Sequence, residues 1–324
     1  MLPMGATPPL VFNALRSRVE TSRCSESPCS RSSLSLHSQS VKILITGAAG
    51  LIGSNMAHRL SRMHKVAALN HGDLDITDRS AVERCIGTAK PELIVNCAVL
   101  QVDESERDPA KAIAVNIEGP RFLAQAAKQV GAELIHFSSQ YVFAGEPIGR
   151  APYTIDDEPA PVNVYGETKL AGEQAVRDAC ARSYVIRTAW VYGSGKESFL
   201  CTAPRDLKGH KRVRAIDDIW SSTTYVDDLI DRAMTIQRKG VYGTYHAVNM
   251  GICSYYEFAL EAGRLGGLSR RDMDSLIEVA HERDMKRIAK RPLYTPLRCL
   301  LSEKLGLPPM RDWHAALTAY ETTV

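Results

Sequence analysis

The chain has 324 residues, of which 44% are hydrophobic and 24% are charged, so it can bury a sizeable core and is not disordered throughout. Its formal net charge of +3 is too small to predict a nucleic-acid partner. No apolar run approaches the roughly 20 residues of a membrane-spanning helix, and the eight cysteines form no CxxC pair, so neither a membrane partner, a disulfide framework nor a metal site is expected.

Residues 1–40 contain ten serines and four arginines but only two acidic residues. They show no helical or alternating apolar pattern that predicts packing. We interpret them as a disordered extension, or as a stretch that results from a start codon assigned too far upstream. Their composition is also typical of organelle-targeting peptides, so targeting is the alternative to the cytoplasmic location that the cysteine usage favours.

Short apolar segments alternate with helical patterns from residue 41 onward. The segments rich in Val, Ile and Leu have the length of buried parallel strands; they are 41–47, 65–70, 93–98, 133–139 and 183–190. Helices are predicted between them at 54–63, 80–88, 109–129 and 165–181. This order predicts an α/β fold with a doubly wound parallel sheet over residues 41–190.

The regular alternation ends after Trp190. A short strand at 241–249 and a helix at 255–265 are predicted in the part that follows. We expect residues 191–324 to form mainly a smaller substrate-binding domain, with part of 212–235 returning to the first domain. This expectation follows from the general position of ligands in open α/β sheets, which bind beyond the carboxyl ends of the strands.

Three glycines lie between the first predicted strand and the helix that follows it. Gly47, Gly50 and Gly53 have the spacing GxxGxxG, in which glycine permits a tight turn and lets a pyrophosphate approach the backbone and the helix N-terminus. This spacing points to a short-chain dehydrogenase with a nicotinamide dinucleotide. The second strand ends at Asn70 instead of the usual acidic residue, which leaves both NADPH and NADH open. Asp75 is a candidate for adenine contact or for a helix N-terminus.

Tyr165 and Lys169 form a YxxxK pair that a helix would place on one face. A nearby ammonium lowers the pKa of a phenol toward working pH and makes it a usable proton donor. Ser139 ends a predicted strand upstream, where its hydroxyl would either stabilise charge on a substrate carbonyl or cap the backbone. Asn116 is a poor helix former within a helical segment; it would hold a kink or a water molecule beside the lysine, or simply be exposed.

Several longer motifs give the chain a wider resemblance. They are LDITD at 74–78, AVNIEGP at 114–120, SSQYVF at 138–143, PYTIDDEPAPVNVYGETKLAGEQAV at 152–176, RTAWVYG at 187–193, SYYEFA at 254–259 and RDWHAAL at 311–317. With these motifs, residues 41–322 resemble the extended short-chain dehydrogenase/reductases, and more narrowly the dTDP-4-dehydrorhamnose reductase family.

The resemblance implies a Rossmann domain with a smaller sugar-nucleotide-binding domain, and reduction of the 4-keto group of a dTDP-activated deoxysugar by NADPH or NADH. It implies that Tyr165 protonates the sugar O4, that Lys169 binds the nicotinamide ribose and lowers the pKa of the tyrosine, and that Ser139 replaces a threonine. The other implied cofactor contacts are Gly47, Gly50, Leu51, Ile52, Gly53, Asp75, Ile76, Cys97, Ala98 and Val99, and the implied sugar contacts are Ser139, Gln140 and Trp190. The oligomeric state, a homodimer included, stays open.

The sequence departs from this family at three places. Gln140 stands where the family has an aspartate, DIWSSTT at 218–224 replaces DQxGSPT, and NCAVLQ at 96–101 replaces NAAAYT. These changes leave the exact sugar and its carrier nucleotide open. Gln140 and Tyr141 occupy the positions of the acid pair that a 4,6-dehydratase needs, so dehydration is not favoured. A sugar-nucleotide epimerase and a non-catalytic NADP-binding subunit, like the regulatory subunit of methionine adenosyltransferase, are the alternatives.

Overall fold

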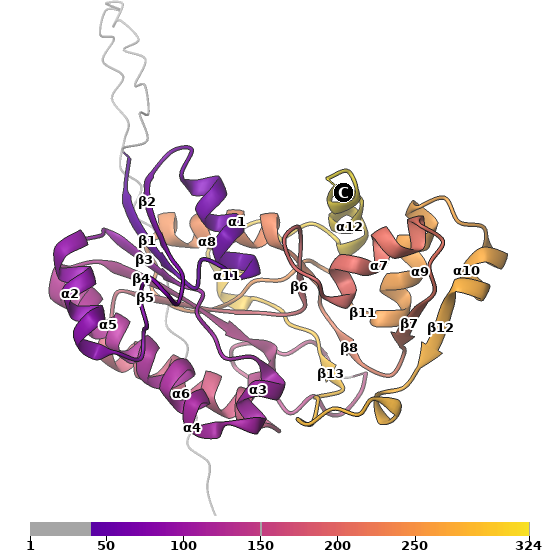
Figure 1. The fold of residues 1–324 in the computed structure, drawn as a ribbon, viewed down its shortest axis with the longest axis horizontal. Helices are drawn as coiled ribbons and strands as arrows, with labels where there is room; N and C mark the ends of the chain where they lie inside the picture. Colours follow the sequence, from indigo (N-terminus) through magenta and orange to yellow (C-terminus); the bar gives the residue numbers. More distant parts are fainter. Residues whose placement is uncertain (1–39, 150, 324) are drawn as a thin grey trace, which may run out of the picture. The chain divides into compact units, whose positions relative to one another are not determined.

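A parallel sheet of six strands lies at the centre of the structure, in the order β10-β5-β4-β3-β1-β2 (Figure 1). The strands are β1 (Lys42–Thr46), β2 (Lys65–Leu69), β3 (Leu93–Asn96), β4 (Glu133–Ser139), β5 (Ser183–Thr188) and β10 (Gly243–His246). This computed structural model describes residues 40–149 and 151–323, and residues 40–324 form one compact unit. The expectations for the N-terminal segment therefore concern residues outside the described part.

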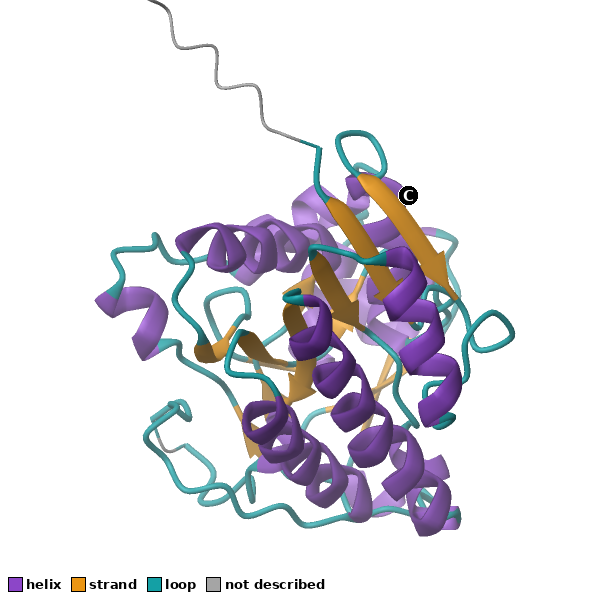
Figure 2. Ribbon diagram, turned by 90° about the vertical axis from the view of Figure 1, so that its left-hand side faces the viewer, coloured by secondary structure: helices purple, strands orange, loops and turns teal. Residues whose placement is uncertain are grey.

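Helices cover both faces of this sheet (Figures 1 and 2). Two of them pack together on one face and three pack side by side on the other. The first group is α1 (Leu51–Leu60) and α8 (Val226–Lys239), and the second is α2 (Arg79–Ala89), α5 (Gly119–Val130) and α6 (Val164–Ala179). Adjacent strand residues alternate between the two cores: Ile43 and Ile45 are buried on the α1 side, and Leu44 on the α5 side. The predicted α/β fold with a doubly wound sheet is confirmed.

The helix predicted at 109–129 is interrupted in the structure. It consists of α4 (Pro109–Ile113), a π-helical turn (Ala114–Glu118) and α5. Asn116 lies in the π-helical turn, where its Oδ1 accepts a hydrogen bond from Leu100 N at 2.9 Å and its Nδ2 donates to Thr168 Oγ1 at 3.1 Å. The irregular backbone expected at Asn116 is therefore present, and its side chain is buried and joins the preceding loop to α6.

The remaining elements connect or follow the sheet. Their bounds are α3 (Val102–Arg107), a 3₁₀ turn (Gln140–Val142), β6 (Val191–Tyr192), α7 (Phe199–Lys208), β7 (Val213–Ile216), β8 (Trp220–Ser221), β9 (Thr224–Tyr225), β11 (Cys253–Ser254), α9 (Tyr255–Leu265), α10 (Arg270–Leu276), β12 (Ile277–Ala280), a 3₁₀ turn (Glu282–Asp284), β13 (Tyr294–Thr295), α11 (Leu300–Lys304) and α12 (Trp313–Glu321). The small sheets pair β8 with both β11 and β13, β12 with β7, and β6 with β9.

Strand β10 corrects the placement of the segment predicted at 241–249. The sequence assigned it to the later region, whereas Gly243–His246 pair in parallel with β5 and extend the main sheet. An uncovered edge of β5 would leave backbone groups unpaired, and β10 satisfies them. Helix α8 also returns to the main sheet, where it contacts α1 and β5. The division into two domains stays a prediction.

Candidate active site

A cavity of about 610 Å³ lies at the carboxyl ends of β1, β3, β4 and β5. Parallel strands deliver their following loops to the same edge, which is why residues far apart in sequence meet there. The predicted site residues that line the cavity are Gly50, Leu51, Ile52, Cys97, Ala98, Val99, Ser139, Gln140, Tyr165, Lys169 and Trp190. Other predicted residues do not line it: Gly47, Gly53, Asp75, Ile76 and Asn116.

The glycine turn brings the backbone of α1 to the cavity. Gly47 has φ +67°, and a Cβ there would lie 2.5 Å from Ala98 N, so only glycine fits between β1 and the loop after β3. No side chain caps the N-terminus of α1 at Gly50. The first backbone N–H groups of α1 lie at the end of the helix that borders the cavity, and no side chain accepts hydrogen bonds from them. This arrangement fits a pyrophosphate.

The two residues expected at the adenine have structural partners of their own. Asp75 Oδ1 accepts hydrogen bonds from Thr77 N at 2.9 Å and from Thr77 Oγ1 at 2.8 Å. Burial tends to raise the pKa of Asp75, but these bonds hold it below its usual value. Ile76 is 4% exposed and packs against Gly119. Neither contact tests whether the two residues meet an adenine, and this assignment stays a prediction.

Helix α6 positions Tyr165 and Lys169. The helix begins after Asn163, whose Oδ1 accepts a hydrogen bond from Gly166 N at 2.8 Å. The Lys169 side chain is 2% exposed, and its Nζ donates to Phe137 O at 2.7 Å. Burial lowers the pKa of Lys169 to about 8, although Glu173 acts in the opposite direction.

The pKa of Tyr165 differs from the sequence expectation. Burial raises the pKa of Tyr165 to about 12, while the Ser139 hydroxyl acts to lower it. The expected lowering by Lys169 is absent, because the ammonium is directed to the Phe137 carbonyl and the loss of solvation dominates. At neutral pH the phenol is therefore fully protonated and available as a proton donor.

The two serines at the end of β4 have different partners. Ser138 Oγ donates to the buried Glu173 Oε1 at 2.6 Å. Ser139 Oγ donates to Gln140 Oε1 at 3.0 Å and accepts from Tyr141 N at 3.2 Å. A glutamine amide is neutral and exchanges hydrogen-bond partners easily, so Ser139 can turn its proton toward a ligand in the cavity.

Sequence reasoning predicted Trp190 but missed Tyr255 and Tyr141, which also line the cavity. Trp190 stacks on Tyr255 with 3.9 Å between ring centroids and 25° between ring planes. Tyr141 meets Tyr165 edge to face at 5.5 Å. Trp190 has φ +38°, which a non-glycine residue adopts rarely and which turns the ring toward Tyr255. The motif SYYEFA contains Tyr255, but nothing local indicates that this residue reaches a strand end 65 positions earlier.

One trio of side chains in the described part has the spacing of a metal site. Asp217, Asp218 and His281 bring ligand atoms within 4.8 Å of one another, and His281 Nδ1 already lies 2.6 Å from Asp217 Oδ1. The trio does not line the cavity, and the expectation of no metal stays a prediction. None of the helices in the described part combines the length and apolar character needed to cross a membrane.

Comparisons with known proteins match nearly the whole compact unit. A family model described as the RmlD substrate binding domain matches residues 41–324. A dTDP-4-dehydrorhamnose reductase from Mycolicibacterium smegmatis is 41% identical over 280 residues, which cover 85% of this chain and 84% of the relative. A probable dTDP-4,6-dihydroxy-2-methyloxan-3-one 4-ketoreductase from Streptomyces antibioticus is 39% identical, over 85% of this chain and 92% of the relative.

A solved structure shows the same similarity in three dimensions. The dTDP-4-dehydrorhamnose reductase from Bacillus anthracis, crystallised in complex with NADP, has a TM-score of 0.82 and 29% sequence identity. The alignment covers 88% of this chain and 100% of that chain. The similarity therefore extends over both the sheet and the elements that follow it.

Proposed function

The chain belongs to the RmlD family of dTDP-4-dehydrorhamnose reductases, and we propose that it reduces the 4-keto group of dTDP-4-dehydrorhamnose to give dTDP-L-rhamnose. The observation that carries this proposal is the meeting of Ser139, Tyr165 and Lys169 in one cavity with the uncapped N-terminus of α1. The relatives named dTDP-4-dehydrorhamnose reductase support the substrate.

The cavity fits a nicotinamide dinucleotide. The turn from Gly47 to Gly50 and the start of α1 would hold its pyrophosphate, and Lys169 would hold the nicotinamide ribose. The bound cofactor supplies a hydride to the substrate carbon C4. An NADP complex of a relative supports NADPH as the cofactor, with NADH as the second candidate.

Two side chains of the protein would stabilise and then neutralise the charge on the substrate oxygen O4. Negative charge develops on O4 as C4 is reduced, and the Ser139 hydroxyl would stabilise this charge by donating a hydrogen bond. Tyr165 would transfer its phenolic proton to O4. Its pKa of about 12 keeps the phenol protonated beforehand. The phenolate left behind needs a neighbouring cation, and the Lys169 ammonium would provide it by turning from Phe137 O toward the phenolate oxygen.

Three alternatives receive less support. Three relatives that match 85% of the chain are named as reductases, which favours neither an epimerase nor a non-catalytic regulatory subunit. Gln140 and Tyr141 at the end of β4 provide no carboxylic acid for a dehydratase. The side chains available at O4 thus suit a proton donor with an oxyanion stabiliser, which is the requirement of a ketone reduction.

The first test is NADPH and NADH oxidation by the full chain at 340 nm, with dTDP-4-dehydrorhamnose as substrate and identification of the product. Tyr165→Phe should lower kcat by about 10²- to 10⁴-fold and leave cofactor affinity nearly unchanged, because it removes only the phenolic oxygen and its proton. Tyr256→Phe is the matched control, since Tyr256 does not line the cavity. Undiminished turnover in Tyr165→Phe would refute the assignment of the proton donor.

A further inference from the structure

The lining of the active-site cavity is positively charged. Among the described residues that line it, Lys169 and Lys196 are basic and none is acidic. A cavity with this charge balance attracts an anionic ligand. Lys169 is buried and donates to Phe137 O, where it serves the proton donor of the proposed reaction. Lys196 is the cation of this lining that the catalytic groups leave without a role.

The ammonium group of Lys196 has no carboxylate partner. Lys196 lies in the exposed segment 194–197 between β6 and α7, and within the described part of the chain it forms no ion pair. The acidic neighbour Glu197 is already engaged, because its two carboxylate oxygens accept from Arg205 Nη1 at 3.1 Å and Nη2 at 3.2 Å. The positive charge of Lys196 is therefore available to a ligand in the cavity.

A hydrogen-bonded asparagine ties this segment to the start of α1. Asn55 Nδ2 donates to Ser194 O at 3.1 Å and to Leu51 O at 2.8 Å. Leu51 is the first residue of α1 and lines the cavity together with Gly50. Lys196 thus follows, two positions later, a residue that is held beside the turn expected to bind the cofactor pyrophosphate.

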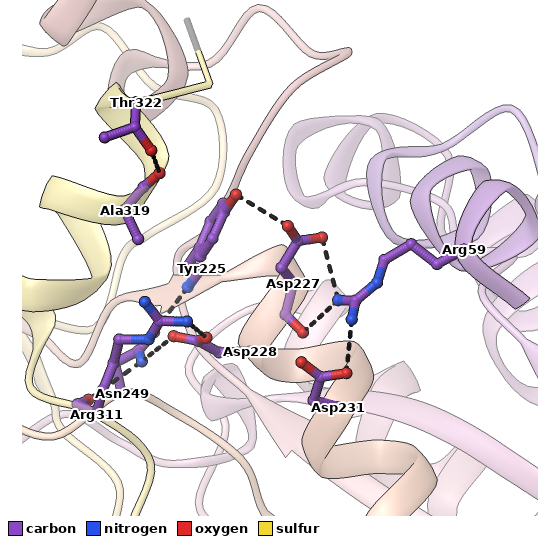
Figure 3. A network of polar contacts seen from close by, with 9 residues as sticks. All are labelled: Arg59, Tyr225, Asp227, Asp228, Asp231, Asn249, Arg311, Ala319 and Thr322. Carbon is purple, nitrogen blue, oxygen red and sulfur yellow. Dashed lines mark hydrogen bonds and ion pairs between the residues drawn. The ribbon is translucent and has the colours of Figure 1, made fainter.

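One polar network fixes α1 and the segment of Lys196 relative to each other (Figure 3). Arg59, in the last turn of α1, donates to Asp227 O at 2.8 Å and pairs with Asp231 at 2.6 Å. Asp227 also accepts from Tyr225 Oη at 3.0 Å. Tyr225 belongs to β9, which pairs with β6, and β6 leads into the segment of Lys196. The backbone that carries Lys196 is therefore positioned from both sides.

We propose that the Lys196 ammonium pairs with the pyrophosphate of the bound nicotinamide dinucleotide. This inference rests on the proposed function and adds a side-chain cation to the pyrophosphate site. Each phosphate of the pyrophosphate carries a negative charge, whereas the N–H groups at the start of α1 provide only a partial positive charge. Because NADPH and NADH share the pyrophosphate, Lys196 should strengthen the binding of both to the same extent and should not select between them.

The test is calorimetric titration of NADPH, NADH and dTDP into the full chain and its variants. In Lys196→Met, the Kd of NADPH and the Kd of NADH should rise by the same factor, about 5- to 10-fold. The Kd of dTDP should stay unchanged, because the proposed ion pair is made with the cofactor. Lys196→Arg should restore cofactor binding, since a guanidinium also pairs with phosphate.

Two controls separate this ion pair from a general effect of charge. Lys128→Met removes one positive charge from α5, outside the cavity lining, and should leave every Kd unchanged. Raising the ionic strength should reduce the difference in cofactor Kd between Lys196→Met and the unaltered chain, because salt screens an exposed ion pair.

Three results would overturn the proposal. The first is an unchanged Kd of both cofactors in Lys196→Met. The second is a loss of affinity for NADPH alone, which would place Lys196 at the 2′-phosphate. The third is a loss of dTDP affinity at least as large as the loss of cofactor affinity, which would assign Lys196 to the sugar nucleotide or to the fold. The reductase activity is tested by turnover of the unaltered chain, so its failure is distinguished from a failed assignment of Lys196.

Discussion

Lys169 lies at the end of a buried hydrogen-bond chain that determines which atoms face its ammonium group. Ala98 N donates to Asn96 Oδ1 at 3.1 Å, which fixes the orientation of the Asn96 amide. Asn96 Nδ2 then donates to His136 Nδ1 at 3.1 Å, so the proton of the neutral His136 ring is on Nε2. That N–H lies 3.4 Å from Lys169 Nζ. Both groups are donors, so no hydrogen bond joins them, and we expect the N–H dipole of His136 to disfavour the charged form of Lys169.

This arrangement predicts the alkaline limb of the pH–rate profile. The pKa of Lys169 is lowered from 10.5 to about 8, so the ammonium is present below pH 8 and is lost as the pH rises through 8. Tyr165 does not titrate in this range, since its pKa is about 12. We therefore expect kcat to fall above about pH 8. His136→Leu should move this limb to higher pH, because it removes the opposing N–H; a limb that stays in place would contradict the role of His136.

The neighbouring serines at the end of β4 offer a matched pair of substitutions. Ser139→Ala should lower kcat by about 10²- to 10³-fold, because it removes a donor for the charge on O4, and Ser139→Thr should restore activity. Ser138→Ala should lower stability instead, because Ser138 donates to the buried carboxylate of Glu173. Steady-state kinetics and urea unfolding of the three variants check this division. Equal kinetic losses in the two alanine variants would contradict it.

Sequence patterns predict the parts of the site that depend on local geometry. The GxxGxxG spacing and the YxxxK spacing are local, and their residues Gly50, Tyr165 and Lys169 meet in the cavity. The stack of Trp190 on Tyr255 is a tertiary contact, and no spacing in the sequence specifies it. The pKa of Tyr165 was predicted in the wrong direction, because burial depends on the whole environment and cannot be read from the YxxxK spacing.

Helix α6 is joined to the sheet by a buried ion pair. Glu173 accepts from Arg187 Nε and Nη2, both at 2.8 Å, and its side chain is fully buried. Burial alone would raise the pKa of Glu173, but Arg187 and Ser138 hold it below the usual value. The paired carboxylate therefore stabilises the fold above its unfolded pKa of 4.5, and this contribution is lost as the pH falls through the lower folded pKa.

Removing one partner of the ion pair between Glu173 and Arg187 should lower the free energy of unfolding. Arg187→Met leaves the Glu173 carboxylate buried without its main partner, and we expect a loss of about 3–5 kcal/mol in the free energy of unfolding. The double variant Glu173→Leu with Arg187→Met should recover much of this loss, because no buried charge is left unpaired; Arg177, which also pairs with Glu173, is partly exposed to solvent. Urea unfolding at pH 7 measures both. A double variant that is as unstable as Arg187→Met would show that packing, not the unpaired charge, causes the loss.

Helices and strands could be predicted from the sequence where a single pattern of apolar residues dominates a segment. Four strands of the main sheet follow from buried apolar runs, as at Leu93–Asn96 and Glu133–Ser139. The strand predicted at 65–70 is also present, but β2 lies at the sheet edge and none of its residues is buried. The break at Ala114–Glu118 could not be located in the helix predicted at 109–129, because it depends on the Asn116 contacts with Leu100 and Thr168. The pairing of β10 with β5 is likewise a tertiary property, since a short apolar strand fits several sheets equally well.

At the scale of the whole molecule, the active-site cavity joins segments that are distant in sequence. The start of α1 contributes Gly50, and helix α9 contributes Tyr255. A ligand that contacts both of these distant segments binds only the folded state, so it stabilises folding according to its concentration. At 100 times its Kd, NADPH should add about 2.7 kcal/mol to the free energy of unfolding, which we expect to appear as an increase of several degrees in Tm.

Gly50→Val tests whether this stabilisation acts through the glycine turn. Gly50 has φ −80° and ψ 166°, which any residue adopts, and a Cβ there would lie 3.3 Å from Gly47 O. The variant should therefore fold after a small shift of the turn, while its side chain fills the space expected for the pyrophosphate. The NADPH-dependent increase in Tm should disappear in Gly50→Val. It should persist in Gly87→Val, because a Cβ at Gly87 meets nothing within 4 Å. An undiminished increase in Gly50→Val would contradict the pyrophosphate site, because the cofactor would then stabilise the fold without using the start of α1.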